Sequence, residues 1–238
     1  MNNRLFLTAE WRELILANYT VDPALLYPLL PAKTEIDFFG DKCYVSLVGF
    51  MFRKVRLKGM PVPFHTSFPE VNLRFYVRRK AGNEWRRGVV FIKEIVPKAA
   101  ITFIANKFFN EHYVTLPMKT ENKQERGQRS ISYSWKKEKW HSIAVKTGTD
   151  KIEFEAGSEE EFITEHYWGY AAALFNITNE YHVSHPPWKM YPVLDYTIDC
   201  DFGKIYGSQF DFLTVQKPGS VFLAEGSAVK VFGKTIID

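Results

Sequence analysis

Three strand-like segments within the first hundred residues, two of them with a two-residue period and the third apolar on both faces, constrain the fold of this chain more than any other feature. They are "CYVSLVGFMF" (43–52), "EVNLRFYVRR" (70–79) and the apolar run 88–96. Successive side chains of a β-strand point to opposite faces, so these segments predict strands. In the second segment one face carries Val71, Leu73, Phe75 and Val77, and the other carries Asn72, Arg74, Tyr76 and Arg78. We therefore expect a sheet with one core face and one polar, aromatic face.

Helix signals are fewer. Trp11, Leu14, Ile15 and Asn18 fall on one helical face, which predicts a helix over 8–18 with Thr8 as its cap. The pair Asp22-Pro23 predicts a short helix, and Pro97 opens one that extends to about residue 113. The capping-box pair Ser158 and Glu161 predicts a helix over 158–167.

Further strands are predicted at 130–135, 141–146, 151–156, 170–175, 180–184, 191–198 and 228–233. Many strands, few helices and no regular strand-helix alternation favour an α+β fold with a large, mainly antiparallel sheet or barrel and a few peripheral helices. Because no Pro/Gly/Ser-rich linker divides the chain, we expect a single domain over residues 1–238.

Composition excludes several functions. The net charge of +4 is small, and acidic residues interrupt the basic segment 119–139, so we expect no nucleic-acid partner. The apolar runs are shorter than the ~18–20 residues that cross a bilayer, so we expect a cytoplasmic protein without a membrane partner. No P-loop or dinucleotide fingerprint occurs, and the six histidines lack metal-binding spacing, which predicts neither cofactor nor metal site.

The strand 88–96 places two charges among apolar residues. With regular alternation, Lys93 shares a face with Val89, Phe91 and Ile95, and Glu94 shares the other with Val90, Ile92 and Val96. An unpaired buried charge costs several kcal/mol. Both side chains must therefore reach a wet cavity or meet opposite charges, such as Glu70 or Arg74.

The chain resembles DUF2071, the YqjF-like family of uncharacterised bacterial proteins, in long strings spread over nearly all of its length. These are "LVGFMF", "VPFHTSFPEVNLRFYVRR", "RRGVVFIKEIVP", "SEEEFITEHYWGY" and "HPPWKMYPV". The first half also resembles the acetoacetate decarboxylase family, through "VDPALLYPLLPAKTEID", "YVSLVGF" and "KEIVPK". This second resemblance implies an acetoacetate-decarboxylase-like barrel.

The decarboxylase resemblance also implies lysine chemistry. Lys98 stands in the place of the Schiff-base lysine, and Lys93 with Glu94 replaces an Arg-Glu pair. Only an unprotonated amine attacks a ketone, so the lysine pKa of ~10.4 must fall by several units. The chain departs from the pattern at Ala99, where the family has a second lysine, and at Ser46, where it has a carboxylate. Lys98, Lys93 and Glu94 are thus candidate catalytic residues of a divergent or degenerate enzyme.

Two functions remain open from the sequence. In the first, the barrel binds a small organic ligand, anionic or an oxo acid, with Arg74, Tyr76, His65 and Glu70 as candidate ligand-binding residues. In the alternative, a structural or interaction protein has a closed interior whose charges pair with one another, and Lys98 is a solvated first-turn lysine. A cavity that reaches Lys93 or Lys98 would favour the first. The oligomeric state, a homo-oligomer included, stays open.

Overall fold

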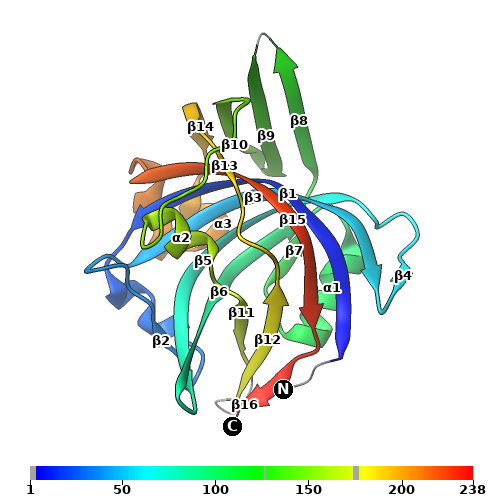
Figure 1. Ribbon diagram of the computed structural model, residues 1–238, viewed down its shortest axis with the longest axis vertical. Helices are drawn as coiled ribbons and strands as arrows, with labels where there is room; N and C mark the ends of the chain where they lie inside the picture. Colours follow the sequence, from blue (N-terminus) through cyan, green and yellow to red (C-terminus); the bar gives the residue numbers. More distant parts are fainter. Residues whose placement is uncertain (1–3, 126, 174–176, 238) are drawn as a thin grey trace.

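The computed structural model describes residues 4–125, 127–173 and 177–237, whose strands form two sheets (Figure 1). The larger sheet has the order β13 (Met190–Tyr191), β15 (Ser220–Phe232), β1 (Leu5–Thr20), β3 (Tyr44–Leu57), β5 (Phe68–Ala81), β6 (Glu84–Val96), β11 (Trp168–Ala172), β12 (Thr178–Ser184) and β16 (Thr235–Ile237). Three short strands extend it, namely β2 (Glu35–Ile36) on β5, β4 (Met60–Pro61) on β3 and β7 (Tyr113–Thr115) on β6.

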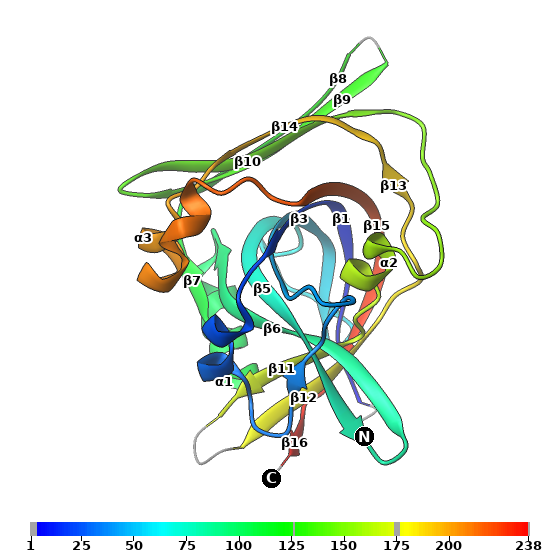
Figure 2. The same ribbon diagram turned by 90° about the vertical axis from the view of Figure 1, so that its left-hand side faces the viewer.

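Pairing in this sheet is mainly antiparallel; among the described strands, β6 with β11 and β6 with β7 are the parallel pairs. Strand β12 also pairs with β15, through Val183 and Ser184. The path β15-β1-β3-β5-β6-β11-β12 therefore returns to its start, and we call it the strand circuit. Figure 2 shows these strands curving around a common interior. The structure confirms the expected α+β class with a large, mainly antiparallel sheet.

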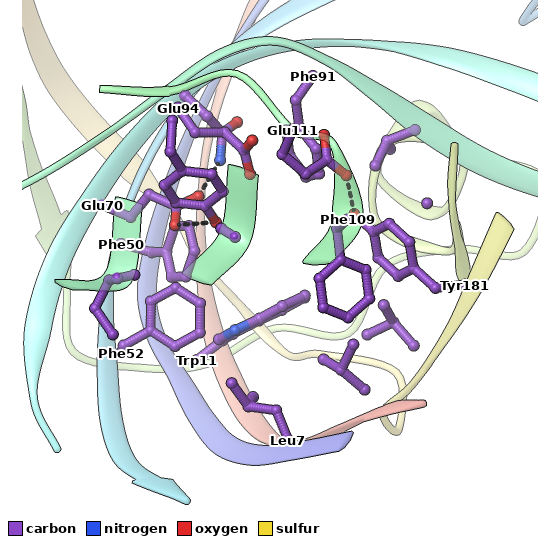
Figure 3. A pocket seen from close by; sticks show the side chains of 18 of the residues that line it. Leu7, Trp11, Phe50, Phe52, Glu70, Phe91, Glu94, Phe109, Glu111 and Tyr181 are labelled. Carbon is purple, nitrogen blue, oxygen red and sulfur yellow. Dashed lines mark hydrogen bonds between the residues drawn. The ribbon is translucent and has the colours of Figure 1, made fainter. Parts of the chain in front are cut away.

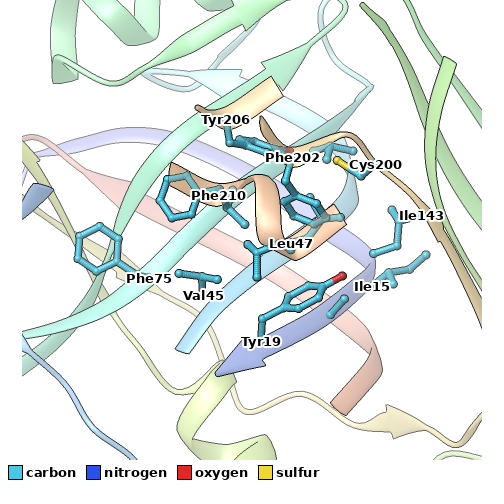
Figure 4. Packing of buried hydrophobic residues seen from close by; sticks show 14 of the residues in the cluster. Ile15, Tyr19, Val45, Leu47, Phe75, Ile143, Cys200, Phe202, Tyr206 and Phe210 are labelled. Carbon is cyan, nitrogen blue, oxygen red and sulfur yellow. The ribbon is translucent and has the colours of Figure 1, made fainter. Parts of the chain in front are cut away.

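A second sheet, with the order β14 (Val193–Asp199), β10 (Lys139–Gly148), β9 (Gln128–Lys137) and β8 (Met118–Glu125), covers the outside of β1 and β3. Gly49 of β3 permits the close approach, because a Cβ there would lie 2.7 Å from Tyr133 Cδ2 of β9. The Tyr133 hydroxyl donates to the Glu13 carbonyl at 2.8 Å. The same hydrophobic cluster continues beyond the second sheet. Figure 4 shows Phe202 and Phe210, which follow β14 in the chain, packed near Leu47 of β3.

The helices are short. They are α1 (Ala99–Phe109), α2 (Glu159–Thr164), α3 (Phe202–Tyr206) and the 3₁₀ turns η1 (Pro23–Leu25), η2 (Tyr27–Leu29) and η4 (Ser208–Thr214). The helices predicted after Asp22, over 97–113 and over 158–167 are confirmed with narrower bounds. Asp22 and Ser158 cap η1 and α2 through their side chains, as expected. None of the described helices is long and apolar enough to span a membrane.

The helix predicted over 8–18 is wrong, because these residues belong to β1. A β-bulge explains the error: the pairing register with β3 shifts between Arg12 and Ile15, and Glu13 has a φ of 59°. The extra residue brings Trp11 and Leu14, three positions apart, to the same face of the strand. A bulged strand thereby reproduces a helical spacing.

The remaining strand predictions are mostly confirmed, with three differences. Residues 151–156 form only an isolated bridge, from Ile152 to Met190, in place of a strand. Pro192, which has no N–H for a ladder, divides 191–198 between β13 and β14 in different sheets. Of the segment 170–175, β11 ends at Ala172, and residues 174 and 175 lie outside the described part of the chain.

Candidate functional site

The interior of the strand circuit holds a cavity of about 160 Å³ (Figure 3). Helix α1 borders it through Ile101, Ile104, Ala105 and Phe109. Most of the wall is apolar, and its large aromatic residues include Trp11, Phe50, Phe52, Phe68, Phe91 and Phe109. The polar and charged lining residues are Glu70, Asn72, Arg74, Glu94, Glu111, Tyr113, His166 and Tyr181. We call Glu70, Glu94 and Glu111 the carboxyl cluster.

Strand geometry places the carboxyl cluster. Alternation along β5 turns Glu70, Asn72 and Arg74 toward the interior, and Asn72 pairs in register with Glu94 of β6. Strand β6 has a β-bulge beside this pair. Leu73 of β5 pairs with Lys93, whereas the next residue, Arg74, pairs with Phe91, so Ile92 is an extra residue in β6. Phe91 and Glu94 therefore both line the cavity although they are three positions apart.

Hydrogen bonds satisfy part of the carboxyl cluster. The Asn72 amide donates to Glu70 Oε1 at 2.9 Å, and the Tyr113 hydroxyl donates to Glu70 Oε2 at 2.9 Å. The Tyr181 hydroxyl donates to Glu111 Oε1 at 2.8 Å. Glu94 Oε2 and Asn72 Oδ1 are buried without a hydrogen-bond partner among the described residues. Glu94 is only 2% exposed, so bulk water does not replace the missing partner.

Burial shifts the acidity of all three carboxyls. It raises the pKa of Glu70 to about 7, although the hydrogen bonds from Asn72 and Tyr113 oppose the rise. It raises the pKa of Glu111 to about 8, against the hydrogen bond from Tyr181. The pKa of Glu94 lies well above its ordinary value because of burial first, and then the charges of Glu111 and Glu70, although hydrogen bonds from the Tyr113 side chain and the His112 backbone oppose the rise. Near neutral pH the carboxyl cluster therefore retains protons.

A second polar group lies near Arg74. Its Nη2 donates to the Ile163 carbonyl at 3.3 Å, and its Nε is buried without a partner among the described residues. His166 Nε2 lies 3.1 Å from Asp37 Oδ2, which also accepts from Arg87 Nε at 2.6 Å. Burial lowers the pKa of His166 to about 4, so the ring is neutral at physiological pH. A neutral ring that donates to Asp37 leaves Nδ1 as an acceptor, and this atom is buried without a hydrogen-bond partner among the described residues.

Neither lysine of the predicted catalytic set lines the cavity. Lys93 lies on the outer face of β6, and its Nζ donates to the Ile205 carbonyl of α3. Burial, followed by the nearby charge of Lys137, lowers the pKa of Lys93. Lys98 is the half-buried residue that precedes α1. The predicted face assignment is wrong for Lys93, because the β6 bulge places it opposite to Val89 and Phe91.

Of the predicted ligand-binding residues, the cavity brings together Arg74 and Glu70, beside Glu94. Tyr76 is buried in the interior, but its hydroxyl bonds Ser46 Oγ at 2.7 Å and it does not line the cavity. His65 lies in the turn before β5, where its Nδ1 is 2.7 Å from the Pro63 carbonyl, and it too is outside the lining.

The sequence did not reveal Glu111, Tyr113 and Tyr181 as site residues. Glu111 and Tyr113 follow α1 and reach the cavity because β7 pairs in parallel with β6. Tyr181 belongs to β12, which is separated from β6 by β11 along the strand circuit. These three residues come together only through strand pairing, which no local sequence pattern predicts. Among the described residues, no group of three or more His, Cys, Asp or Glu side chains is placed to hold a metal ion.

The fold is that of the acetoacetate-decarboxylase-like proteins. Acetoacetate decarboxylase from Legionella pneumophila subsp. pneumophila str. Philadelphia 1 has a similar structure, with a TM-score of 0.67 and 12% identity over 98% of this chain and 87% of that one. The enduracididine biosynthesis enzyme MppR, complexed with pyruvate, gives a TM-score of 0.68 and 12% identity over 98% and 90% of the two chains. At this identity the likeness concerns the fold alone.

Within that fold class, the chain belongs to the DUF2071 family, described as an uncharacterized conserved protein, whose model matches residues 8–228. The uncharacterized protein YqjF of Bacillus subtilis (strain 168) is 27% identical over 183 residues, which cover 75% of this chain and 72% of YqjF. Both resemblances seen in the sequence are thereby confirmed.

Proposed function

We propose that the protein binds a small organic molecule in the interior cavity, with an apolar body against the aromatic wall and a polar head at the carboxyl cluster. The observation that carries this proposal is Glu94, whose Oε2 is buried without a hydrogen-bond partner among the described residues. A buried polar atom left unpaired costs about 1–3 kcal/mol. A molecule that donates a hydrogen bond there removes this cost when it binds.

The size of the cavity limits the ligand. Its volume of about 160 Å³ is close to that of an engineered apolar cavity of ~150 Å³ that binds benzene. A single six-membered ring with a small substituent, or a branched chain of similar volume, therefore fits. Nucleotides and other large cofactors do not.

The charges favour a neutral or cationic head. Three carboxyls line the cavity, and Arg74 is the one arginine or lysine among the described lining residues. A carboxylate ligand would add another negative charge in a place where burial already raises the pKa of three acids. We therefore replace the anionic ligand expected from the sequence by a neutral or cationic one.

Glu94 is the residue to which we assign proton transfer if the protein is an enzyme. A carboxyl whose pKa is raised by burial retains a proton that it can donate to a bound molecule. The solved structures with this fold include enzymes, which favours a catalytic version of the proposal. Lys93 and Lys98 receive no role in it, because neither lines the cavity. The unpaired polar atoms on the wall weigh against a closed interior of paired charges.

Two matched substitutions on α1 test the proposal. Ala105 lines the cavity, whereas Ala100 on the same helix is exposed. We expect fragments of one ring to raise the melting temperature of the wild type and of Ala100→Phe. Ala105→Phe fills the cavity and should weaken fragment binding at least tenfold, measured by ligand-observed NMR. Unchanged binding to Ala105→Phe would place the ligand elsewhere and refute the proposal.

A further inference from the structure

The hydrogen-bonding capacity around the carboxyl cluster is unbalanced. Three side-chain donors at the carboxyl cluster are already used: the Tyr113 hydroxyl and the Asn72 amide donate to Glu70, and the Tyr181 hydroxyl donates to Glu111. Two other donors of the cavity wall, Trp11 Nε1 and Arg74 Nε, are buried without a hydrogen-bond partner among the described residues. Beside Glu94, the unfilled acceptor is Asn72 Oδ1, on the paired position of β5, and Glu94 Oε2 becomes a second acceptor when its carboxyl ionises. The missing chemical group is therefore one that is rich in hydrogen-bond donors.

The carboxyl cluster also lacks a cation. Arg74 is the nearest candidate, but its Nη2 donates to the Ile163 carbonyl and its guanidinium lies 5.6 Å above the Tyr76 ring. Its charge is the smallest of the influences that act on the pKa of Glu70. The other two acids, Glu94 and Glu111, have no basic side chain among the causes of their pKa shifts.

The apolar wall suits the body of a cationic molecule. The ring centroids of Trp11 and Phe50 are 5.6 Å apart, those of Trp11 and Phe52 are 6.0 Å apart, and those of Phe50 and Phe52 are 5.0 Å apart. These three rings form a continuous aromatic surface beside the carboxyl cluster (Figure 3). Such a surface accommodates an aryl or branched alkyl group, and aromatic faces also attract a nearby cation.

We infer that the cavity is a site for a small primary amine with an aryl or branched alkyl body, whose ammonium group donates to Glu94 Oε2 and Asn72 Oδ1. The inference rests on the proposed function and names its ligand class. The ammonium supplies both the donors and the positive charge that the site lacks. Glu111, whose Oε1 is held by Tyr181, adds a second carboxyl for the same charge.

Proton release should accompany binding of the amine. Six titratable or charged groups other than Glu94 line the cavity: Glu70 and Arg74 of β5, Glu111 after α1, Tyr113 of β7, His166 before β11 and Tyr181 of β12. Without a cation, burial keeps the carboxyls protonated at neutral pH. An ammonium beside them favours their ionised forms, so a carboxyl proton passes to the buffer while the ligand keeps its charge.

Three probes of one shape separate the ligand classes: benzylamine, benzyl alcohol and benzoate. Calorimetric titration at pH 7 in phosphate and in MOPS, two buffers of different ionisation enthalpy that contain no primary amine, gives both the affinity and the number of protons released. We expect benzylamine to bind the wild type at least tenfold more tightly than the other two probes, with release of about one proton.

The variant Glu94→Gln keeps the shape of the side chain and removes its charge. It should weaken benzylamine binding at least tenfold while changing benzyl alcohol binding less than twofold, and Glu111→Gln should act in the same direction. Glu84→Gln, at the exposed start of β6, is the control and should leave all affinities unchanged. Circular dichroism of each variant reports whether it folds.

Two outcomes overturn the inference in distinguishable ways. If benzyl alcohol or benzoate binds as tightly as benzylamine, or if Glu94→Gln weakens the alcohol and the amine equally, the amine assignment fails and the cavity remains a binding site. If none of the three probes binds the wild type, both the amine assignment and the proposed function at this ligand size fail.

Discussion

The acid cluster in the cavity predicts an unusual dependence of stability on pH, which the substitution Glu70→Gln isolates. Burial raises the pKa of Glu70 from 4.5 to about 7 in the folded protein. Between these two values the folded chain binds more protons than the unfolded chain. The free energy of unfolding therefore falls as the pH rises through this window, and the contribution of Glu70 is fully present only below pH 4.5.

The magnitude follows from the size of the shift. From 4.5 to about 7 is about 2.5 pH units, and each unit corresponds to ~1.4 kcal/mol, so Glu70 accounts for a fall of about 3 kcal/mol. A glutamine has the same shape but does not ionise. In Glu70→Gln the fall in the free energy of unfolding between pH 5 and 8 should be smaller than in the wild type by up to this amount.

Urea unfolding followed by circular dichroism, repeated at half-unit steps from pH 5 to 8, measures this difference. The exposed Glu84→Gln serves as the control, and its pH dependence should match that of the wild type. Parallel curves for wild type and Glu70→Gln would refute the reasoning, because they would mean that Glu70 ionises equally easily in the folded and unfolded chain.

Two further predictions concern the lysines and the contact between the sheets. Because Lys93 and Lys98 lie outside the cavity, borohydride treatment with pyruvate or acetoacetate should leave the mass of the protein unchanged; a stable adduct on either lysine would contradict the placement. Gly49→Ala should lower the free energy of unfolding by about 1–3 kcal/mol, since the new methyl group meets the Tyr133 ring at 2.7 Å. Gly148→Ala, with no neighbour within 4 Å, is the matched control and should change stability by less than about 0.5 kcal/mol.

The fold was largely predictable because its strands follow simple alternation. Along β5, Val71, Leu73 and Phe75 pack in the hydrophobic cluster between the larger sheet and the elements that cover its outside. Asn72 and Arg74 lie on the other face and line the cavity, as the alternation in the sequence indicates. Burial on both faces of a closed sheet explains why the polar face is not exposed to solvent. The acetoacetate-decarboxylase-like arrangement of these strands was predicted from the resemblance to known families. Alternation alone could not distinguish this arrangement from other antiparallel sheets.

The site was predictable only in part. Glu70, Arg74 and Glu94 were named from the sequence, since charged residues in an otherwise apolar strand need partners. Glu111 and Tyr181 were not, because they come from segments 70 residues apart that are brought near each other by the pairing of β7 with β6, β6 with β11 and β11 with β12. Strand pairing between distant segments cannot be predicted from a short window of sequence.

The bulges are the specific reason that local patterns failed. An extra residue in β1 made a strand resemble a helix. An extra residue in β6 placed Glu94, in place of Lys93, on the same face as Val89 and Phe91. Both bulges lie beside the cavity. Bulges are common next to functional sites, where they redirect a side chain, and periodicity cannot locate them.

The β6 bulge has a consequence for comparing members of this family. Because Ile92 is supernumerary, an acid instead of an amine projects into the cavity from the Lys93-Glu94 pair. In a homologue with the same two letters in the same alignment columns but with an unbulged strand, the face that carries Phe91 would also carry Lys93 in place of Glu94. The charge that such a strand turns toward the interior can therefore change sign without any substitution at the aligned positions.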